Sequence, residues 1–269
     1  MPTKTVNGAT LNYSEAGAGE PLVLLHCSSS TSRQWRGLCE LLAEDFRTLA
    51  IDMYGYGGTS DWSGDTKDLL TDEGDLIRAM TEDCPDGFHL LGHSYGGTIC
   101  MRLALEFPER LKSLTLIEPT TPWLLDPLAD KAAYDEIFKT AHEFQSAFEA
   151  GDPEPGIEYY FDYWNGPGAW QSALDEVRAY CVKTAEKTYR EFDVILDPSH
   201  QVAPLNALSM PLLLIRGEIT RAPARRVTDI IHAALPHSAL VDIPGAGHMS
   251  PITHADEVNE VVAGFLRGL

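Results

Sequence analysis

The sequence predicts an α/β fold, in which a mostly parallel β-sheet is covered by helices on both faces and carries one helical insertion. Short apolar runs of strand length alternate with helical patterns over most of the 269 residues, which is typical of a parallel sheet with crossover helices. Residues 88–107 combine a strand, a glycine-flanked turn and a helix. Between residues 119 and 208 the strand-like runs stop and helical patterns take over.

The expected sheet begins with a hairpin and continues with parallel strands. The first segment alternates around Asn7 and Gly8, a pair that favours the positive φ values of a tight turn. Further strands are indicated by short apolar runs at residues 21–26, 47–51, 88–91, 114–117, 212–215 and 239–243. A polar loop at residues 27–32 follows the first of these runs, and a glycine-rich turn at residues 52–60 follows the second. A helix is expected from about residue 66 to residue 84.

Ser94 lies in a turn that suits a nucleophile. Residues 88–91 read as a buried strand, and apolar residues recur at helical spacing after the turn. Gly92 and Gly96 flank the serine and leave room for a sharp, strained strand-to-helix junction that exposes the hydroxyl. The free N–H groups at the start of the following helix would face a developing oxyanion. The pattern therefore predicts that Ser94 is a catalytic nucleophile.

The insertion between the strands predicts a lid. Helical patterns cover residues 131–150, 156–164 and 172–192. Because the insertion follows the carboxyl end of a strand, the edge where such folds bind ligands, it is placed to cover a site. Some of its aromatic side chains are expected to form its own core and others to face the cleft. The candidates for substrate contact are Trp123, Tyr160 and Trp164.

Composition limits the class of protein and its partners. A hydrophobic content of 44% is enough for one core, which we assign to residues 1–120 and 209–269, with a cap at residues 121–208. Forty acidic and 20 basic residues give a formal charge of −20, which argues against nucleic acids and anionic membranes as partners. The acidic residues are scattered, so a solvated acidic surface is favoured over a specific cationic partner.

The cysteines and apolar runs indicate a cytoplasmic protein. The five cysteines are widely spaced and form no CxxC pair, so neither a disulfide framework nor a zinc site is expected. No signal sequence is recognisable, and the apolar runs have strand length rather than membrane length. We expect a monomer or homodimer without a metal or an organic cofactor.

Four motifs in the same order resemble those of the α/β-hydrolase superfamily. They are the His-Gly-X-like loop at residues 24–28, the DxxGxGxS turn at residues 52–60, the elbow around Ser94 and the loop of residues 245–248 that ends in His248. The resemblance implies an eight-stranded sheet, a cap after the sixth strand and an oxyanion hole made by the backbone N–H groups of Ser28 and Tyr95. The sequence departs from the family at Cys27, where glycine is usual.

The general base and the acid of a triad follow from the same resemblance. His248 follows the last strand and comes from the sheet edge that carries Ser94, so it is the expected base, with His254 as the alternative. The family usually places an aspartate after the seventh strand, where this chain has Thr220. Glu118 closes the sixth strand, a position similar to the acid site of zearalenone-type lactonases and some haloalkane dehalogenases. Glu118 is favoured, while Glu218 or an incomplete triad stay open.

The predicted reaction is hydrolysis of a small-molecule ester or lactone. A serine nucleophile excludes the alkyl-ester chemistry of aspartate-dependent dehalogenases and epoxide hydrolases. Ser94 would form an acyl-enzyme, with His248 as base and Glu118 as the orienting acid. Two alternatives remain at this point: hydrolysis of carbon–carbon bonds in ring-cleavage products, and a non-catalytic ligand-binding relic of a hydrolase.

Overall fold

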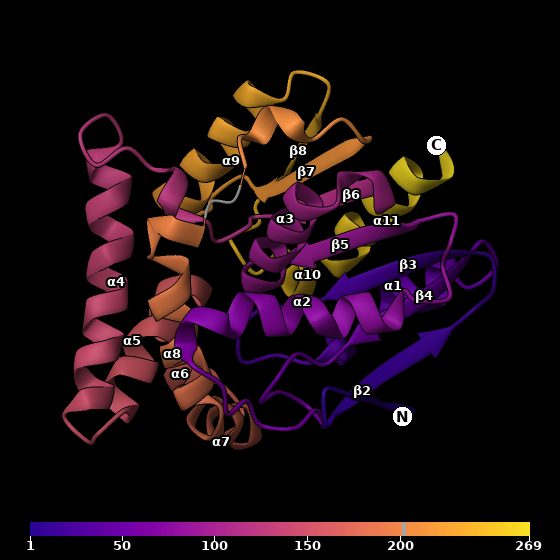
Figure 1. The fold of residues 1–269 in the computed structure, drawn as a ribbon. Coiled ribbons are helices and arrows are strands. Elements are labelled where there is room, and N and C mark those ends of the chain that lie inside the picture. The colour runs from indigo at the N-terminus through magenta and orange to yellow at the C-terminus, as the bar shows by residue number, and fades with distance from the viewer. Residues whose placement is uncertain (201–202) are drawn as a thin grey trace.

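An eight-stranded sheet forms the centre of the molecule (Figure 1), in the order β1-β2-β4-β3-β5-β6-β7-β8. The computed structural model describes residues 1–200 and 203–269. The strands are β1 (Thr3–Val6), β2 (Ala9–Ala16), β3 (Glu20–Leu25), β4 (Phe46–Ile51), β5 (Phe88–His93), β6 (Leu111–Ile117), β7 (Leu212–Gly217) and β8 (Ala239–Ile243). The strands β4, β3, β5, β6, β7 and β8 pair in parallel, which confirms the mostly parallel sheet.

The sheet begins with the predicted hairpin. β1 and β2 pair antiparallel around Asn7 and Gly8, which have φ values of 50° and 85°. Both values lie in the left-handed region that asparagine and glycine tolerate. β2 then pairs antiparallel with β4. The sequence-based expectation for this end of the sheet is therefore confirmed.

Helices cover both faces of the sheet, because successive side chains of each buried strand point to opposite faces. Leu22 and Leu24 of β3 pack with α1 (Arg36–Leu42) and α11 (Ala255–Arg267). Val23 and Leu25 belong to the apolar cluster on the opposite face, which includes residues of α2 (Leu69–Met80), α3 (Tyr95–Glu106) and α9 (Ala222–Ala234). A short helix, α10 (Ser250–Thr253), follows β8 and precedes α11. The continuous apolar strands are thus buried on both sides.

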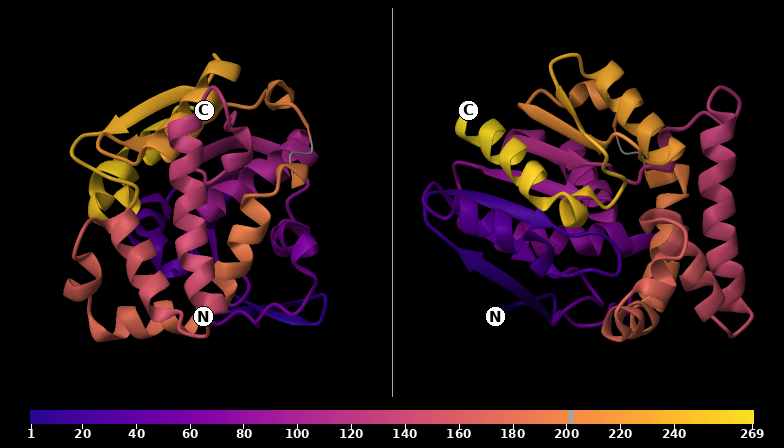
Figure 2. Two further views of the ribbon diagram at one scale, coloured as in Figure 1. Left: turned by 90° about the vertical axis from the view of Figure 1, so that its left-hand side faces the viewer. Right: turned by 180° about the vertical axis from the view of Figure 1, so that it is seen from behind.

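The remaining helices lie between β6 and β7 in the chain. They are α4 (Lys131–Glu149), α5 (Glu154–Asn165), α6 (Ala169–Ser172), α7 (Asp175–Lys183) and α8 (Ala185–Ile195). They gather on one side of the molecule, at the left in Figure 1. In Figure 2, α4 lies in front in the left view and at the right-hand edge in the right view, so it is the outer helix of this group. The predicted cap, residues 121–208, includes residues 201–202, which lie outside the described residues.

Two predicted helices differ from those found. The segment expected to be one helix over residues 172–192 is two helices, because Thr184 leaves helical geometry with ψ at 4°. Its side-chain hydroxyl donates to the Tyr180 carbonyl at 2.9 Å and lies 3.2 Å from the Ser29 hydroxyl, so the break is tied to a contact with a distant loop. The helix expected to reach residue 84 ends at Met80, where Thr81 turns a hydroxyl back onto the Ile77 carbonyl at 2.9 Å.

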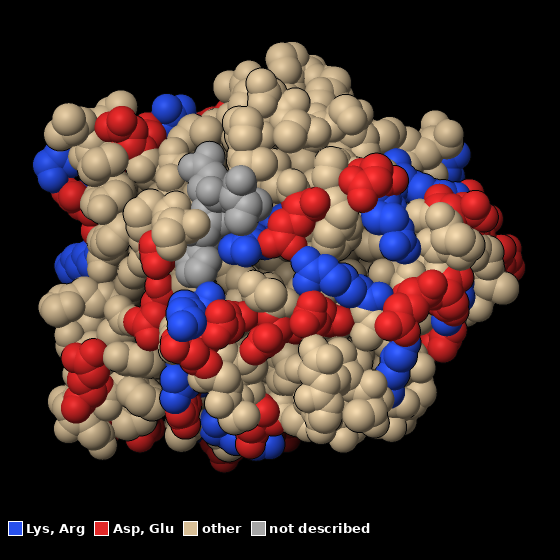
Figure 3. Space-filling view, viewed as in Figure 1, with Lys and Arg blue, Asp and Glu red and all other residues tan. Residues whose placement is uncertain are grey.

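The surface and the cysteines agree with the composition. Acidic and basic side chains are interspersed on the face seen in Figure 3, and surface ion pairs such as Arg102–Glu106 join some of them. All five cysteines fall within the described residues and are free and buried. Across residues 1–200 and 203–269, none of the helices has the length and apolar character that a membrane span requires.

Candidate active site

Ser94 occupies the junction between β5 and α3 in a strained backbone conformation. Its φ is 55° and its ψ is −119°, a combination that non-glycine residues adopt only when the surroundings hold them there. A side chain at Gly92 would come within 2.4 Å of the Gly96 carbonyl oxygen, and one at Gly96 within 2.5 Å of the His26 carbonyl oxygen. The two flanking glycines are therefore required by close backbone approach, as the sequence pattern predicted.

His248 lies in the loop after β8 and reaches Ser94. Its Nε2 is 2.9 Å from the Ser94 Oγ, and both residues are at most 4% exposed. The loop is held by His93, whose Nε2–H donates to the His248 carbonyl at 2.9 Å. Gln34 donates to the other ring nitrogen of His93 at 3.2 Å. The predicted nucleophile and base are therefore in hydrogen-bond contact, and His254 lies outside this contact, bonded to Thr253.

Glu118 is the carboxylate that contacts the imidazole of His248. Its Oε2 lies 2.6 Å from the His248 Nδ1, and the residue is 0% exposed. Gly217 donates its backbone N–H to Oε1 at 2.7 Å, and Thr220 donates its hydroxyl to Oε2 at 2.6 Å. With Nδ1–H donating to the carboxylate, Nε2 is left to accept the Ser94 proton.

The other carboxylate considered from sequence lies elsewhere. Glu218 accepts the backbone N–H of Gly245 at 2.8 Å and is exposed. Thr220, at the position where the family usually has an aspartate, supports Glu118 instead of replacing it. The backbone of Glu118 has a φ of 44°, so this residue is also held in the left-handed region that side chains disfavour.

Two threonines of the site were not found by sequence reasoning. Thr220 was noted as a departure from the family pattern, but its hydrogen bond to Glu118 joins residues 102 apart in the chain. Thr120 places its hydroxyl 3.1 Å from the Ser94 Oγ, and Thr98 donates to the Thr120 carbonyl at 2.6 Å. The position of Thr120 two residues after Glu118 was a possible signal, since both follow the same strand.

Two small cavities at this site share lining residues. The first, about 10 Å³, is lined by both predicted oxyanion residues and by cap residues: Ser28, Tyr95, Thr120, Tyr160, Trp164, Thr188, Glu191, Phe192 and Ile195. The second, also about 10 Å³, is apolar and shares Thr120 and Trp164 with the first. A volume of this size holds about one water molecule. A substrate larger than that requires the cap or its side chains to move.

The two predicted oxyanion donors are free to act. The backbone N–H of Ser28 donates to no group within residues 1–200 and 203–269. Tyr95 is the first residue of α3, so its N–H is one of those that have no partner inside the helix. The positive end of the helix dipole lies at the same place. Both residues line the first cavity together with Thr120, whose hydroxyl lies 3.1 Å from the Ser94 Oγ.

The three aromatic candidates for substrate contact differ in position. The Trp164 ring stacks on the His248 ring with centroids 3.9 Å apart and an interplanar angle of 32°, and it lines both cavities. Tyr160 lines the first cavity and also packs on Phe144 and Phe192 in the cap core. Trp123 packs, partly buried, against the main apolar cluster and is not among the residues that line these two cavities.

Burial keeps His26, the histidine before the predicted oxyanion loop, neutral. Met53 donates its backbone N–H to the Nε2 of His26 at 3.2 Å, so Nδ1 carries the proton and donates to the Cys27 carbonyl at 2.7 Å. Burial lowers the pKa of His26 from 6.5 to about 4, although the nearby Asp52 opposes the change. The ring therefore acts as a neutral brace between two backbone segments.

We expect this histidine to make the protein less stable in acid. Below pH 6.5 the unfolded chain binds a proton at His26 that the folded chain does not bind until about pH 4. The loss of unfolding free energy between these values should reach about 3 kcal/mol. Urea unfolding of the wild type from pH 7.5 to pH 4 measures it. The decline should be shallower in His26→Asn and unchanged in His237→Asn, an exposed histidine. Equal slopes in wild type and His26→Asn would refute the assignment.

Comparisons with known proteins show the family to which the chain belongs. A family model described as the alpha/beta hydrolase family matches residues 22–261. The pimeloyl-[acyl-carrier protein] methyl ester esterase of Nitrosomonas europaea is 26% identical over 255 residues, covering 89% of this chain and 93% of that protein.

Two solved structures share the fold. The enol-lactonase of Burkholderia xenovorans has a TM-score of 0.74 at 20% identity, covering 99% of this chain and 100% of the other. An epoxide hydrolase of Bacillus megaterium in complex with an inhibitor has a TM-score of 0.75 at 20% identity, with the same coverage. With its eight-stranded sheet and a family match over nearly its whole length, the chain belongs to the alpha/beta hydrolase family.

Proposed function

We propose that the protein is a serine hydrolase that cleaves a carboxylic ester or lactone through an acyl-enzyme on Ser94. The observation that carries the proposal is the position of His248, which contacts the Ser94 hydroxyl through Nε2 and the Glu118 carboxylate through Nδ1. This arrangement gives a serine the base it needs and gives the base a fixed tautomer.

The reaction follows from these contacts in two halves. The Ser94 Oγ attacks the carbonyl carbon while its proton passes to the Nε2 of His248, and Glu118 stabilises the resulting imidazolium. The carbonyl oxygen becomes an oxyanion that accepts hydrogen bonds from the N–H groups of Ser28 and Tyr95. Collapse of this intermediate expels the alcohol, which takes the proton from His248. Water then attacks the acyl-enzyme, with His248 again as the base, and releases the carboxylic acid and Ser94.

An ester is favoured over other substrates by the chemistry of the site and by one relative. The esterase of Nitrosomonas europaea is named for cleavage of a methyl ester, a reaction that a serine nucleophile, its base and two oxyanion donors can carry out. The apolar cavity beside Thr120 and Trp164 has walls that include Leu125, Ile137 and Val227, so it would suit an apolar portion of a small-molecule substrate once the cap or its side chains move to enlarge it.

A covalent label tests the proposal directly. We expect a fluorophosphonate to add one phosphonyl group to the wild type, seen by intact mass, and not to Ser94→Ala. The reagent requires an activated serine, which the contact between His248 and Ser94 supplies. A folded wild type that remains unlabelled, with circular dichroism equal to that of Ser94→Ala, would refute the proposal.

A substrate panel then separates the hydrolase reactions. p-Nitrophenyl esters of rising acyl length, a panel of lactones and a ring-cleavage dienoate are assayed side by side with wild type and Ser94→Ala. Turnover of esters or lactones that disappears in Ser94→Ala supports the proposed reaction. Turnover confined to the dienoate would instead assign carbon–carbon bond hydrolysis to the same residues.

A further inference from the structure

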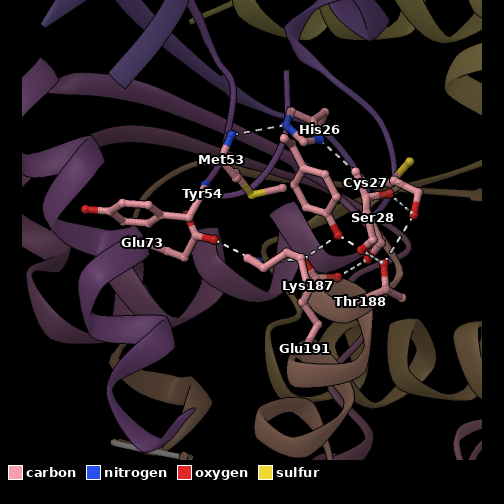
Figure 4. Close-up of polar contacts among 12 residues, drawn as sticks. His26, Cys27, Ser28, Met53, Tyr54, Glu73, Lys187, Thr188 and Glu191 are labelled. Atoms are coloured by element: carbon pink, nitrogen blue, oxygen red, sulfur yellow. Dashed lines mark hydrogen bonds and ion pairs between the residues drawn. The ribbon is translucent and has the colours of Figure 1, made fainter. Parts of the chain in front are cut away.

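A buried ionic cluster joins the cap helix α8 to the core. The Lys187 ammonium lies 2.7 Å from Glu191 Oε1 and 3.0 Å from Glu73 Oε1, which belongs to α2. The exposed fractions of the three residues are 7%, 2% and 0%. Burial opposes charge on Lys187, but Glu191 and Glu73 outweigh this effect and raise its pKa. Figure 4 shows the side chains of Lys187, Glu191 and Glu73 converging near the loop that carries Ser28.

Glu191 extends this cluster to the predicted oxyanion donor. Its Oε2 accepts the side-chain hydroxyl of Ser28 at 2.5 Å. Its other oxygen, Oε1, accepts from Lys187 and also from the Tyr56 hydroxyl at 2.8 Å. The carboxylate therefore has a fixed orientation, set by two donors on one side, and it presents its second oxygen to the loop (Figure 4).

The cap helices α7 and α8 contact the next residues of the loop. The Ser29 hydroxyl lies 3.2 Å from the hydroxyls of Thr188 and Thr184. Tyr180 of α7 donates its hydroxyl to the Ser30 carbonyl at 3.0 Å. Three successive serines, beginning with Ser28, are thus each bound by a side chain of α7 or α8. The start of the loop is bound by the core, because the His26 Nδ1–H donates to the Cys27 carbonyl at 2.7 Å.

The loop needs such support because of its own sequence. Ser29 has a φ of 52°, a left-handed conformation that side chains disfavour and that surrounding contacts must maintain. Two residues earlier the chain has Cys27, which lacks the conformational freedom of the glycine usual at that position of the family's loop. The loop contains no glycine from residue 27 to residue 32. Its shape is therefore imposed by neighbours.

We propose that Glu191 is a positioning residue for the oxyanion hole: it holds the Ser28 side chain so that the Ser28 backbone N–H faces the carbonyl oxygen of the substrate. The cap thereby completes the hole, in addition to covering the site. This inference rests on the proposed function, since the hole matters only if Ser94 forms a tetrahedral intermediate. Loss of one complete oxyanion donor typically lowers kcat by about 100- to 1,000-fold.

Glu191→Gln should lower kcat by about 10- to 100-fold and leave KM within about twofold, because the donor is displaced rather than removed. The variant should fold, since Lys187 keeps its ion pair with Glu73. The matched control is Glu186→Gln on the same helix, an exposed residue paired with Arg190, which should leave both constants unchanged. A rise in KM with constant kcat would show that Glu191 binds substrate instead, and would overturn the proposal.

A double-mutant cycle identifies the route through Ser28. Ser28→Ala removes the hydroxyl that Glu191 accepts but retains the backbone N–H. If Glu191 acts through Ser28, each single variant and the double variant should lose a similar fraction of kcat. Losses that multiply in the double variant would overturn the proposal. If Glu191→Gln fails to fold, Ser28→Ala tests the proposal by itself. A wild-type kcat in Ser28→Ala would also overturn the proposal.

Hydrogen exchange separates this inference from the proposed function. Amides in a peptide that covers residues 27–32 should exchange faster in Glu191→Gln than in wild type or Glu186→Gln, whatever the reaction. Unchanged exchange in that peptide would overturn the inference even in an active esterase. Faster exchange in a chain that no fluorophosphonate labels would support the hold of Glu191 on the loop and refute the serine-hydrolase proposal.

Discussion

Glu118→Gln is expected to reduce kcat/KM by about 30- to 5,000-fold, which corresponds to about 2 to 5 kcal/mol of transition-state stabilisation. The carboxylate accepts from three donors: Gly217 N–H on one oxygen, and Thr220 and His248 on the other. An amide replaces one acceptor with an NH₂ group, which must face at least one of these donors. If it faces His248, the imidazole adopts the tautomer that cannot accept the Ser94 proton.

Steady-state hydrolysis of a p-nitrophenyl ester measures this effect. The matched control is Glu218→Gln, which makes the same chemical change at the end of the neighbouring strand β7, at a carboxylate that accepts from Gly245. We expect Glu218→Gln to remain within a fewfold of wild type. Equal kcat/KM values for wild type and Glu118→Gln would remove Glu118 from the triad.

Lys187→Met is expected to destabilise the protein by about 3 to 5 kcal/mol, the usual effect of removing one partner of a buried ion pair. Glu73 and Glu191 would then both be buried without the cation that lies 3.0 Å and 2.7 Å from them. Burial already raises the pKa of Glu73 in the presence of Lys187, which acts against that change. Urea unfolding at pH 7.5 measures the loss.

Two further variants make the Lys187 prediction specific. Lys183→Met, at an exposed position of the neighbouring helix, should change the unfolding free energy by less than about 0.5 kcal/mol. Glu73→Gln in the Lys187→Met background should recover part of the stability, because it removes one of the two uncompensated charges. A Lys187→Met protein as stable as wild type would show that the cluster is not held by its cation.

Local patterns in the sequence were sufficient for most of the architecture. Asn7 and Gly8 determine a hairpin through their own φ preferences. Gly92 and Gly96 are required because a side chain at either position would clash with nearby backbone atoms. The helix expected over residues 131–150 is α4, Lys131–Glu149. The hairpin and the helix depend on neighbours in the chain, and the glycines stand in a recognisable local pattern, so periodicity and turn chemistry reveal these features without coordinates.

Contacts between distant segments were beyond the reach of these patterns. Sequence reasoning left both Glu118 and Glu218 open as the acid. The choice depends on which carboxylate contacts His248, and the three residues follow three different strands, β6, β7 and β8. The contact between Glu191 and Ser28 joins residues 163 apart in the chain. Thr184, which interrupts a predicted helix, bonds to the same distant loop. Each of these features arises from tertiary packing that overrides or selects among local preferences.

The hydrogen bonds from α7 and α8 to three successive serines limit which parts of the cap can be replaced in this protein. Grafting the whole segment between β6 and β7 from another family member would leave Ser28 and Ser29 without Glu191 and Thr188. A chimera of that kind should have a lower kcat for every substrate, in addition to any change in specificity. Libraries that aim to change substrate range should therefore diversify α4, α5 and α6 and retain the sequence of α7 and α8.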